Sequence, residues 1–139
     1  KIGFEQLFWK VKQNPGKPMF FAKSERPDQN PCYLLGLPGN PAAVYIAMQI
    51  YVSTLISTVQ GQKQLPQWFS AVISHDLKVD SRERFLRMAL SFDSGMLKLS
   101  SLPKQQSHML SNLMQAKCIV RIPAAQNIQA GQILQGLFI

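Results

Sequence analysis

Two short loops hold the residues of this chain that are best suited to bind an anion. Residues 14–18 have the sequence Asn-Pro-Gly-Lys-Pro, and residues 37–41 have the sequence Leu-Pro-Gly-Asn-Pro. The first loop offers the ammonium group of Lys17, a point charge that suits phosphate. The second loop opens into a predicted helix, whose N-terminus presents unpaired N–H groups and a partial positive charge. The two loops therefore predict a site for phosphate or a similar oxyanion.

Each loop also has a purely structural interpretation, which stays open at this point. Asn40 is a good N-cap and Pro41 suits the first helical position, so the second loop is equally typical of a helix cap without a ligand. Lys10 and Lys12 share one face of the strand before the first loop. Together with Lys17 they are typical of a solvated surface as well as of an anion site.

The elements that must position these loops follow from the apolar pattern. We predict the last turns of a helix over residues 1–7 and a type II turn over 14–17, where Gly16 takes a positive φ. The predicted strands are 8–13, 18–23 and 32–37, the last as a buried strand of a parallel sheet. A helix is expected from Pro41 to about Gln60, ending at Gly61. Its apolar face is expected to comprise Val44, Ala47, Met48, Tyr51, Leu55 and Val59.

The second half of the chain has a different pattern. A polar segment, 62–67, predicts a linker between a first unit, 1–61, and a second, 68–139. Short strands are predicted at 69–74, 84–92, 96–101, 117–122 and 133–138, with a hairpin turn at 93–95. Residues 107–115 are expected to form a short helix. This pattern predicts a small β-barrel or sandwich.

Composition excludes several classes of protein. The chain has 139 residues, 46% of them hydrophobic and 16% charged, which argues for a globular core and against disorder. No uninterrupted apolar run reaches the roughly 18 residues that span a bilayer. The net charge of +8 favours anionic partners, but the basic residues follow no nucleic-acid-binding pattern. Cys32 and Cys118 lack metal-ligand spacing and are expected to be reduced thiols of a cytoplasmic protein.

The order of the motifs resembles that of a known family. Four segments carry the resemblance in addition to the first loop: Phe-Trp-Lys at 8–10, Gly-Leu-Pro-Gly-Asn-Pro at 36–41, Arg-Phe-Leu-Arg at 84–87 and Ser-His-Met-Leu-Ser at 107–111. In this order they resemble the C-terminal part of MoeA, the molybdopterin molybdenumtransferase family that includes the gephyrin E domain. The resemblance covers essentially the whole chain.

The resemblance implies a fold and an activity. Residues 1–61 would be the C-terminal portion of a molybdopterin-binding three-layer α/β domain, followed by the family's small β-rich domain. The family inserts molybdate into adenylylated molybdopterin, releases AMP and uses a divalent cation such as Mg²⁺. It also implies a homodimer, a MogA-like partner and a cytoplasmic location, with neither nucleic acid nor membrane as a partner.

The resemblance also assigns roles to residues of this sequence. Lys10 and Lys17 would hold the phosphate or molybdate oxygens as catalytic residues. The substrate-binding residues would be Gly16, Pro38, Gly39, Asn40, Pro41, Arg87 and Ser107. No metal ligand is assigned, since the family's acidic motif lies upstream of residue 1, and we expect residues 1–139 alone to be inactive.

Two positions depart from the family pattern, and two other functions stay open. Asn14 stands where many members carry a long polar side chain such as lysine, and Gln106 replaces a common glycine. The first alternative function is a scaffold or partner-binding module without catalysis, as the gephyrin relationship allows. The second is a basic nucleic-acid binder, for which steep salt-dependent binding would be the sign.

Overall fold

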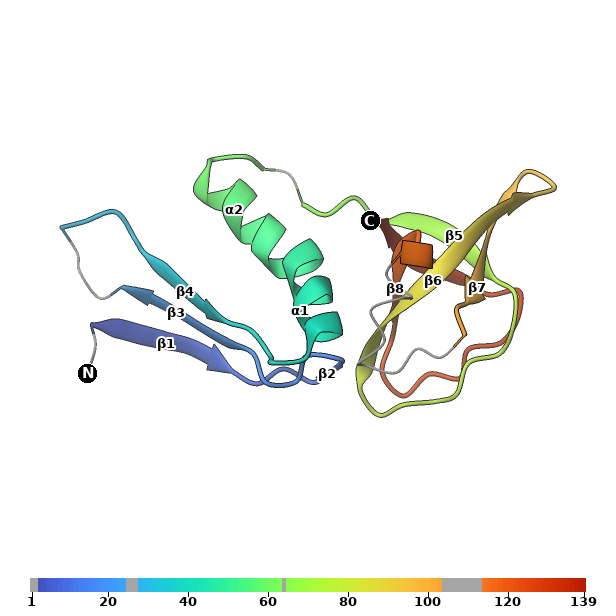
Figure 1. Ribbon diagram of the computed structural model, residues 1–139, viewed down its shortest axis with the longest axis horizontal. Coiled ribbons are helices and arrows are strands. Elements are labelled where there is room, and N and C mark those ends of the chain that lie inside the picture. The colour runs from blue at the N-terminus through green and yellow to red at the C-terminus, as the bar shows by residue number, and fades with distance from the viewer. Residues whose placement is uncertain (1–2, 25–27, 64, 104–113) are drawn as a thin grey trace.

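A computed structural model describes residues 3–24, 28–63, 65–103 and 114–139 of the chain. Its first half contains a three-stranded sheet in the order β1 (Phe4–Trp9), β3 (Phe20–Ser24) and β4 (Tyr33–Gly36). Both outer strands pair antiparallel with β3. Figure 1 shows this sheet at one end of the molecule, a β-barrel at the other, and the long helix between them.

The helix predicted for residues 1–7 is wrong for the described residues of that range. From Phe4 onward the chain is strand β1, which pairs with β3, and Glu5 forms an ion pair with Lys23 at 3.1 Å across the two strands. The predicted strand at 8–13 is interrupted, because Lys10 has a φ of +68° and turns the backbone out of the sheet. Strand geometry returns only at β2 (Gln13–Asn14).

The strand predicted at 32–37 exists as β4, but its predicted environment is wrong. It pairs antiparallel with β3, and Tyr33 and Leu34 are exposed. A continuous apolar run does not reveal the direction of the neighbouring strand, which here is set by the short connection from β3 to β4.

One helix spans the expected residues, with an irregular middle. It consists of α1 (Pro41–Ala47), a π-helical segment η1 (Met48–Val52) and α2 (Ser53–Val59). The chain leaves the helix at Gln60 and Gly61, and Gly61 has a φ of +74°, as predicted. The predicted apolar face is largely wrong, since the buried side chains are those of Ala42, Ala43, Ile46, Ala47 and Ile50.

The second half forms a barrel, one of the two architectures predicted for it. Its strands are β5 (Phe69–Ile73), β6 (Glu83–Asp93), β7 (Met96–Ser101), β8 (Cys118–Ile122) and β9 (Ile133–Phe138). They pair in the order β6-β7-β5-β9-β8, and β8 pairs with β6 to close the ring. Its interior is filled by side chains of alternate positions, including Ile73, Met88, Leu99, Val120 and Ile122.

The predicted hairpin turn joins β6 and β7. Asp93 pairs with Met96, which leaves Ser94 and Gly95 as a two-residue turn. Both have positive φ, +52° and +80°, as the favoured two-residue hairpin turns require.

The helix packs on the outer face of the barrel. Ile46 and Ile50 form an interface cluster with Phe85 of β6 and Ile119 of β8. The side chains of Phe85 and Ile119 point out of the barrel because those of their strand neighbours fill its interior. Burial against these two residues explains which side of the helix is apolar.

Three further expectations can be placed against the structure. By length and composition alone, the helix Pro41–Val59 could cross a bilayer, whereas the apolar pattern of the sequence predicts no such span. Core helices of soluble proteins have the same property. The predicted linker, 62–67, lies between α2 and β5, and the division into two domains stays a prediction. The short helix predicted at 107–115 falls mostly outside the described residues.

The interface cluster gives a test of this packing. The side chain of Ile119 is 0% exposed, so Ile119→Ala should lower the free energy of unfolding by about 2–5 kcal/mol. Ile133→Ala on strand β9 is the matched control, because Ile133 is 69% exposed and its truncation should change stability by less than about 0.5 kcal/mol. Denaturant unfolding of both variants measures the difference. Equal losses would contradict the packing described.

Candidate functional site

The two predicted anion loops leave the small sheet at the same edge. Trp9 of β1 and Gly36 of β4 are both paired with Phe20 of β3, one on each side. Because β1 and β4 run in the same direction, the loops that follow them, starting at Lys10 and Leu37, leave the same end of the sheet, with β3 between them. Two interstrand spacings, about 10 Å in all, separate the two starting points.

The first loop is closed at its base by backbone hydrogen bonds. The Lys10 N–H donates to the Met19 carbonyl at 2.8 Å, and the N–H groups of Val11 and Met19 both donate to the Lys17 carbonyl at 3.0 Å. Lys10 and Lys17 are therefore held on facing sides of the same loop base. The structure brings these two predicted site residues together.

The two lysines differ in what their side chains meet. The Lys10 ammonium lies 3.9 Å from the centroid of the Trp9 ring, a cation–π contact that holds it along the exposed sheet edge. The side chain of Lys17 is exposed at the loop. Lys17 is therefore the better placed of the two to meet an anion in front of the loop, and the oxyanion role of both remains a prediction.

The second loop is the predicted helix cap. Asn40 has extended backbone angles, its side-chain oxygen accepts from the Ala42 N–H at 2.9 Å, and Pro41 is the first helical residue. The amide of Ala42 is therefore already bonded, so an anion would have to be met by the remaining groups of the loop. Nothing lies within 4 Å of the position that a Cβ on Gly39 would take, so the backbone there is open to a ligand. Pro38, directly before Gly39, is buried, so its contact with a substrate stays a prediction.

Gly16 is needed for packing inside the first loop. It has a φ of +105°, and a Cβ at this position would lie 2.7 Å from Nε2 of Gln13. The space beside Gly16 is thus taken by the Gln13 side chain, which explains the glycine without a ligand. Contact between Gly16 and a substrate stays a prediction.

Asn14 ties the first loop to the barrel. Its side-chain amide donates to Asp80 at 3.4 Å, and its backbone pairs in parallel with Arg84 at the start of β6. The Asp80 carboxylate also accepts from the backbone N–H of Arg82 at 2.9 Å and from its guanidinium at 3.3 Å. These contacts, the backbone one first, lower the pKa of Asp80 below its ordinary value of 3.8. The residue that departs from the family pattern thus has a structural partner.

Of the two site residues predicted in the second half, Arg87 and Ser107, the structure describes only Arg87. Arg87 lies on β6, 3% exposed, opposite Ile119 of β8. Burial lowers its pKa, and its Nη1 has no hydrogen-bond partner among the described residues. Arg84 is in the opposite phase of the strand, as predicted, and donates to the Lys78 carbonyl. Ser107 lies outside the described residues.

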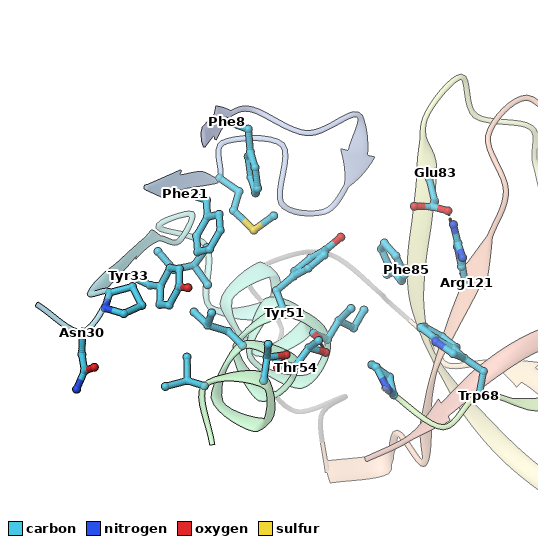
Figure 2. Close-up of a pocket in the computed structure, with 18 residues that line it drawn as sticks. Phe8, Phe21, Asn30, Tyr33, Tyr51, Thr54, Trp68, Glu83, Phe85 and Arg121 are labelled. Atoms are coloured by element: carbon cyan, nitrogen blue, oxygen red, sulfur yellow. Dashed lines mark hydrogen bonds and ion pairs between the residues drawn. The ribbon is translucent and has the colours of Figure 1, made fainter. Parts of the chain in front are cut away.

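A large groove behind the first loop was not predicted. It has a volume of about 990 Å³ and lies between the sheet, the helix and the barrel. Figure 2 shows Phe8, Phe21 and Tyr33 on the sheet side, with Phe85 and Trp68 on the barrel side and Tyr51 between them. One feature of the sequence could have indicated this groove: aromatic residues occur in the sheet, in the helix and in the barrel half.

The groove is not suited to an oxyanion. Its walls are mainly aromatic and aliphatic, and its charged pair, Glu83 and Arg121, is neutralised internally by a contact of 2.5 Å. An anion transferred there would lose its hydration without a free cation to replace it. The end of the sheet with Lys17 is therefore a better candidate site for an oxyanion than this groove.

The described residues contain no cluster of metal-binding side chains for the magnesium ion that the resemblance implies. Among them, no three side chains of His, Cys, Asp or Glu lie close enough together to hold a metal ion. Carboxylate oxygens are the usual protein ligands of magnesium. We assign the ion to no residue of this chain and derive no step through it.

Comparison with known proteins finds a family model for the barrel half. Residues 70–137 match the model described as the MoeA C-terminal region (domain IV). The match covers strands β5 to β9, with its ends inside the first and the last of them.

Nearly the whole chain aligns with relatives named molybdopterin molybdenumtransferase. It is 32% identical over 140 aligned residues to the molybdopterin molybdenumtransferase of Haemophilus influenzae, and 27% identical over 142 to that of Bacillus subtilis. These alignments cover 95% and 100% of this chain and 32% of each relative, so the chain spans about a third of their length. The resemblance to the C-terminal part of MoeA is confirmed.

Solved structures agree on the fold. The MoeA protein of Pyrococcus horikoshii superposes with a TM-score of 0.72 at 18% identity, over 97% of this chain and 33% of that one. A molybdenum cofactor biosynthesis protein of Pyrococcus furiosus superposes with a TM-score of 0.73 at 21% identity, over 97% of this chain and 46% of that one. The barrel is thus a fold shared with these proteins, and a larger α/β domain around the small sheet stays a prediction.

The contact between loop and barrel predicts a pH dependence. Since the pKa of Asp80 is lower in the folded than in the unfolded chain, its ionised form stabilises the fold above pH 3.8. This stabilisation is lost as the pH falls through the lower, folded value. Asp80→Asn should therefore be less stable than the parent at pH 7, and the difference should shrink in acid. Unfolding free energies over this pH range measure it.

Asp28→Asn is the control for this prediction. Asp28 lies in the exposed segment before β4, far along the chain from the barrel contact. The free energy of unfolding of Asp28→Asn should stay close to that of the parent protein at every pH. If Asp80→Asn lowers the free energy of unfolding by the same amount at pH 7 and in acid, the ionised Asp80 carboxylate is not the cause.

Proposed function

We propose that this chain is part of an enzyme of molybdenum cofactor biosynthesis that inserts molybdate into adenylylated molybdopterin and releases AMP. The relatives named as molybdopterin molybdenumtransferases support the pathway. The use of Mg²⁺, a homodimer, a MogA-like partner and a cytoplasmic location belong to the same proposal and rest on the family resemblance.

The observation that carries the proposal is the shared edge of the small sheet. Lys17 and the open backbone at Gly39 belong to two loops that leave the same end of the sheet, after β1 and β4. A tetrahedral oxyanion needs charge and several donors within a few ångströms, and two adjacent loops can supply them together. Neither loop alone distinguishes a binding site from an ordinary turn or cap.

In this proposal the chain binds and orients the reactants. The Lys17 ammonium donates hydrogen bonds to oxygens of molybdate or of the substrate phosphate and offsets their charge. The loop from Pro38 to Pro41 sets the wall opposite the lysine. Lys10, already held against Trp9, raises the local positive potential.

Lys17→Ala tests the role of the first loop in the complete protein that carries these residues. Loss of a charged hydrogen bond should raise the half-saturating molybdate concentration about tenfold or more. Stability should change by less than about 0.5 kcal/mol, because the side chain is exposed. Steady-state formation of AMP as a function of molybdate concentration measures the first effect, and thermal unfolding measures the second.

Lys23→Ala is the matched control. It removes a lysine from the same sheet, at the end of β3 away from the loops, where the side chain pairs with Glu5. Its molybdate dependence should match that of the parent protein. If Lys17→Ala also matches the parent, the oxyanion site lies elsewhere.

A further inference from the structure

The first loop is built around a buried polar side chain. Gln13 is 3% exposed, although most of strand β1 before it and the residues Lys17 and Pro18 after it are exposed. Its Nε2 donates to the Pro15 carbonyl at 3.0 Å, and its Oε1 accepts from the hydroxyl of Tyr51. A buried amide needs such partners, because an unpaired buried polar group costs about 1–3 kcal/mol.

Tyr51 reaches this amide from the irregular part of the helix. It lies in the π-helical segment η1, where one residue more than usual is fitted into a turn. The hydroxyls of Ser53 and Thr54 donate to the carbonyls of Gln49 and Ile50 at 2.5 Å, so side chains help to satisfy the backbone there. Within this segment, Ile50 is part of the interface cluster and the Tyr51 hydroxyl bonds the Gln13 amide.

The loop also touches the barrel at this point. The backbone of Gln13 pairs in parallel with Glu83, one residue before the Asn14 contact with β6. Gly16 fits against the Gln13 amide because it lacks a Cβ. The turn that carries Lys17 is therefore fixed from the helix through Tyr51, from the barrel through β6, and from within through Pro15.

We propose that Gln13 and Tyr51 are positioning residues, which hold the turn at Pro15 and Gly16 so that Lys17 meets the oxyanion. This inference rests on the proposed function. Neither side chain contacts the oxyanion, since Gln13 is buried and Tyr51 faces the groove behind the loop. Their effect on binding passes through the shape of the loop.

Burial keeps the Tyr51 hydroxyl protonated. Glu83 and Arg121 line the same groove, and they act on the hydroxyl in opposite directions. Burial, the larger cause, raises the pKa of Tyr51 above its ordinary value of 10.0. The hydroxyl therefore keeps its proton at neutral pH and donates to Gln13.

Tyr51→Phe tests the proposal in the complete protein. It removes one hydroxyl and leaves the ring in the groove. We expect the half-saturating molybdate concentration to rise about fivefold, with the maximal rate nearly unchanged, because one neutral hydrogen bond is lost. Backbone amide exchange should accelerate at Lys10, Val11 and Met19, whose N–H groups close the loop base. The Ser24 amide, bonded to Cys32 at the other end of the sheet, is the internal reference.

Two further variants complete the test. Tyr45→Phe makes the same chemical change on the same helix, at a residue that packs beside the interface cluster, and should behave as the parent. Gln13→Leu removes both hydrogen bonds and should exceed the effect of Tyr51→Phe on both readouts. Thermal unfolding of each variant separates a local change in the loop from a global loss of structure.

The outcomes separate this inference from the proposed function. Faster amide exchange at the loop base, together with a higher half-saturating molybdate concentration, supports the positioning role. Unchanged exchange, or faster exchange with an unchanged molybdate dependence, overturns it even when Lys17→Ala shows its expected effect. If Lys17→Ala has no effect, the proposed oxyanion site fails, and the positioning role fails with it, whatever the exchange rates.

Discussion

Packing of one helix against the outside of the barrel fixes the arrangement of the whole chain. Ile46 and Ile50 are buried against Phe85 and Ile119, and this apolar contact sets where the helix lies. The helix in turn carries the small sheet, because its N-terminus follows directly from β4. If this contact were lost, the loops at the sheet edge would no longer meet the start of β6.

The conformation of the first loop depends on this packing of helix and barrel, although its sequence alone is typical of an ordinary turn. It is held by a tyrosine of the helix, by backbone pairing with β6 and by an aspartate of the barrel. A flexible lysine gains little from binding an anion if the loop must first be ordered. In the proposed site, a loop ordered in advance by these three contacts would lower that cost, so the barrel would contribute to binding without direct contact to the anion.

The sequence was sufficient where a local pattern determines the structure. The five barrel strands, the two-residue hairpin turn, and the cap at Asn40 and Pro41 all follow from alternation, turn chemistry or capping, and the structure has them. Both loops lie at the same end of the small sheet, and their common site stays a prediction. The family resemblance rested on the same loops and on their spacing.

The failures concern contacts between distant segments. The direction of β4 depends on its neighbour β3, and the buried side of the helix depends on where the barrel lies. The π-helical segment and the buried Gln13 both serve contacts between residues 38 positions apart, which no local pattern contains. Asn14 shows the same limit, since only the structure reveals its partner Asp80.

The most direct test of the central claim is the position of molybdenum in crystals of the complete protein. Its anomalous scattering locates molybdate without reference to any assumed site. The account predicts molybdenum between the loop that carries Lys17 and the loop from Pro38 to Pro41, with Lys17 in contact. Molybdenum bound only elsewhere, with both loops unoccupied at saturating molybdate, would contradict it.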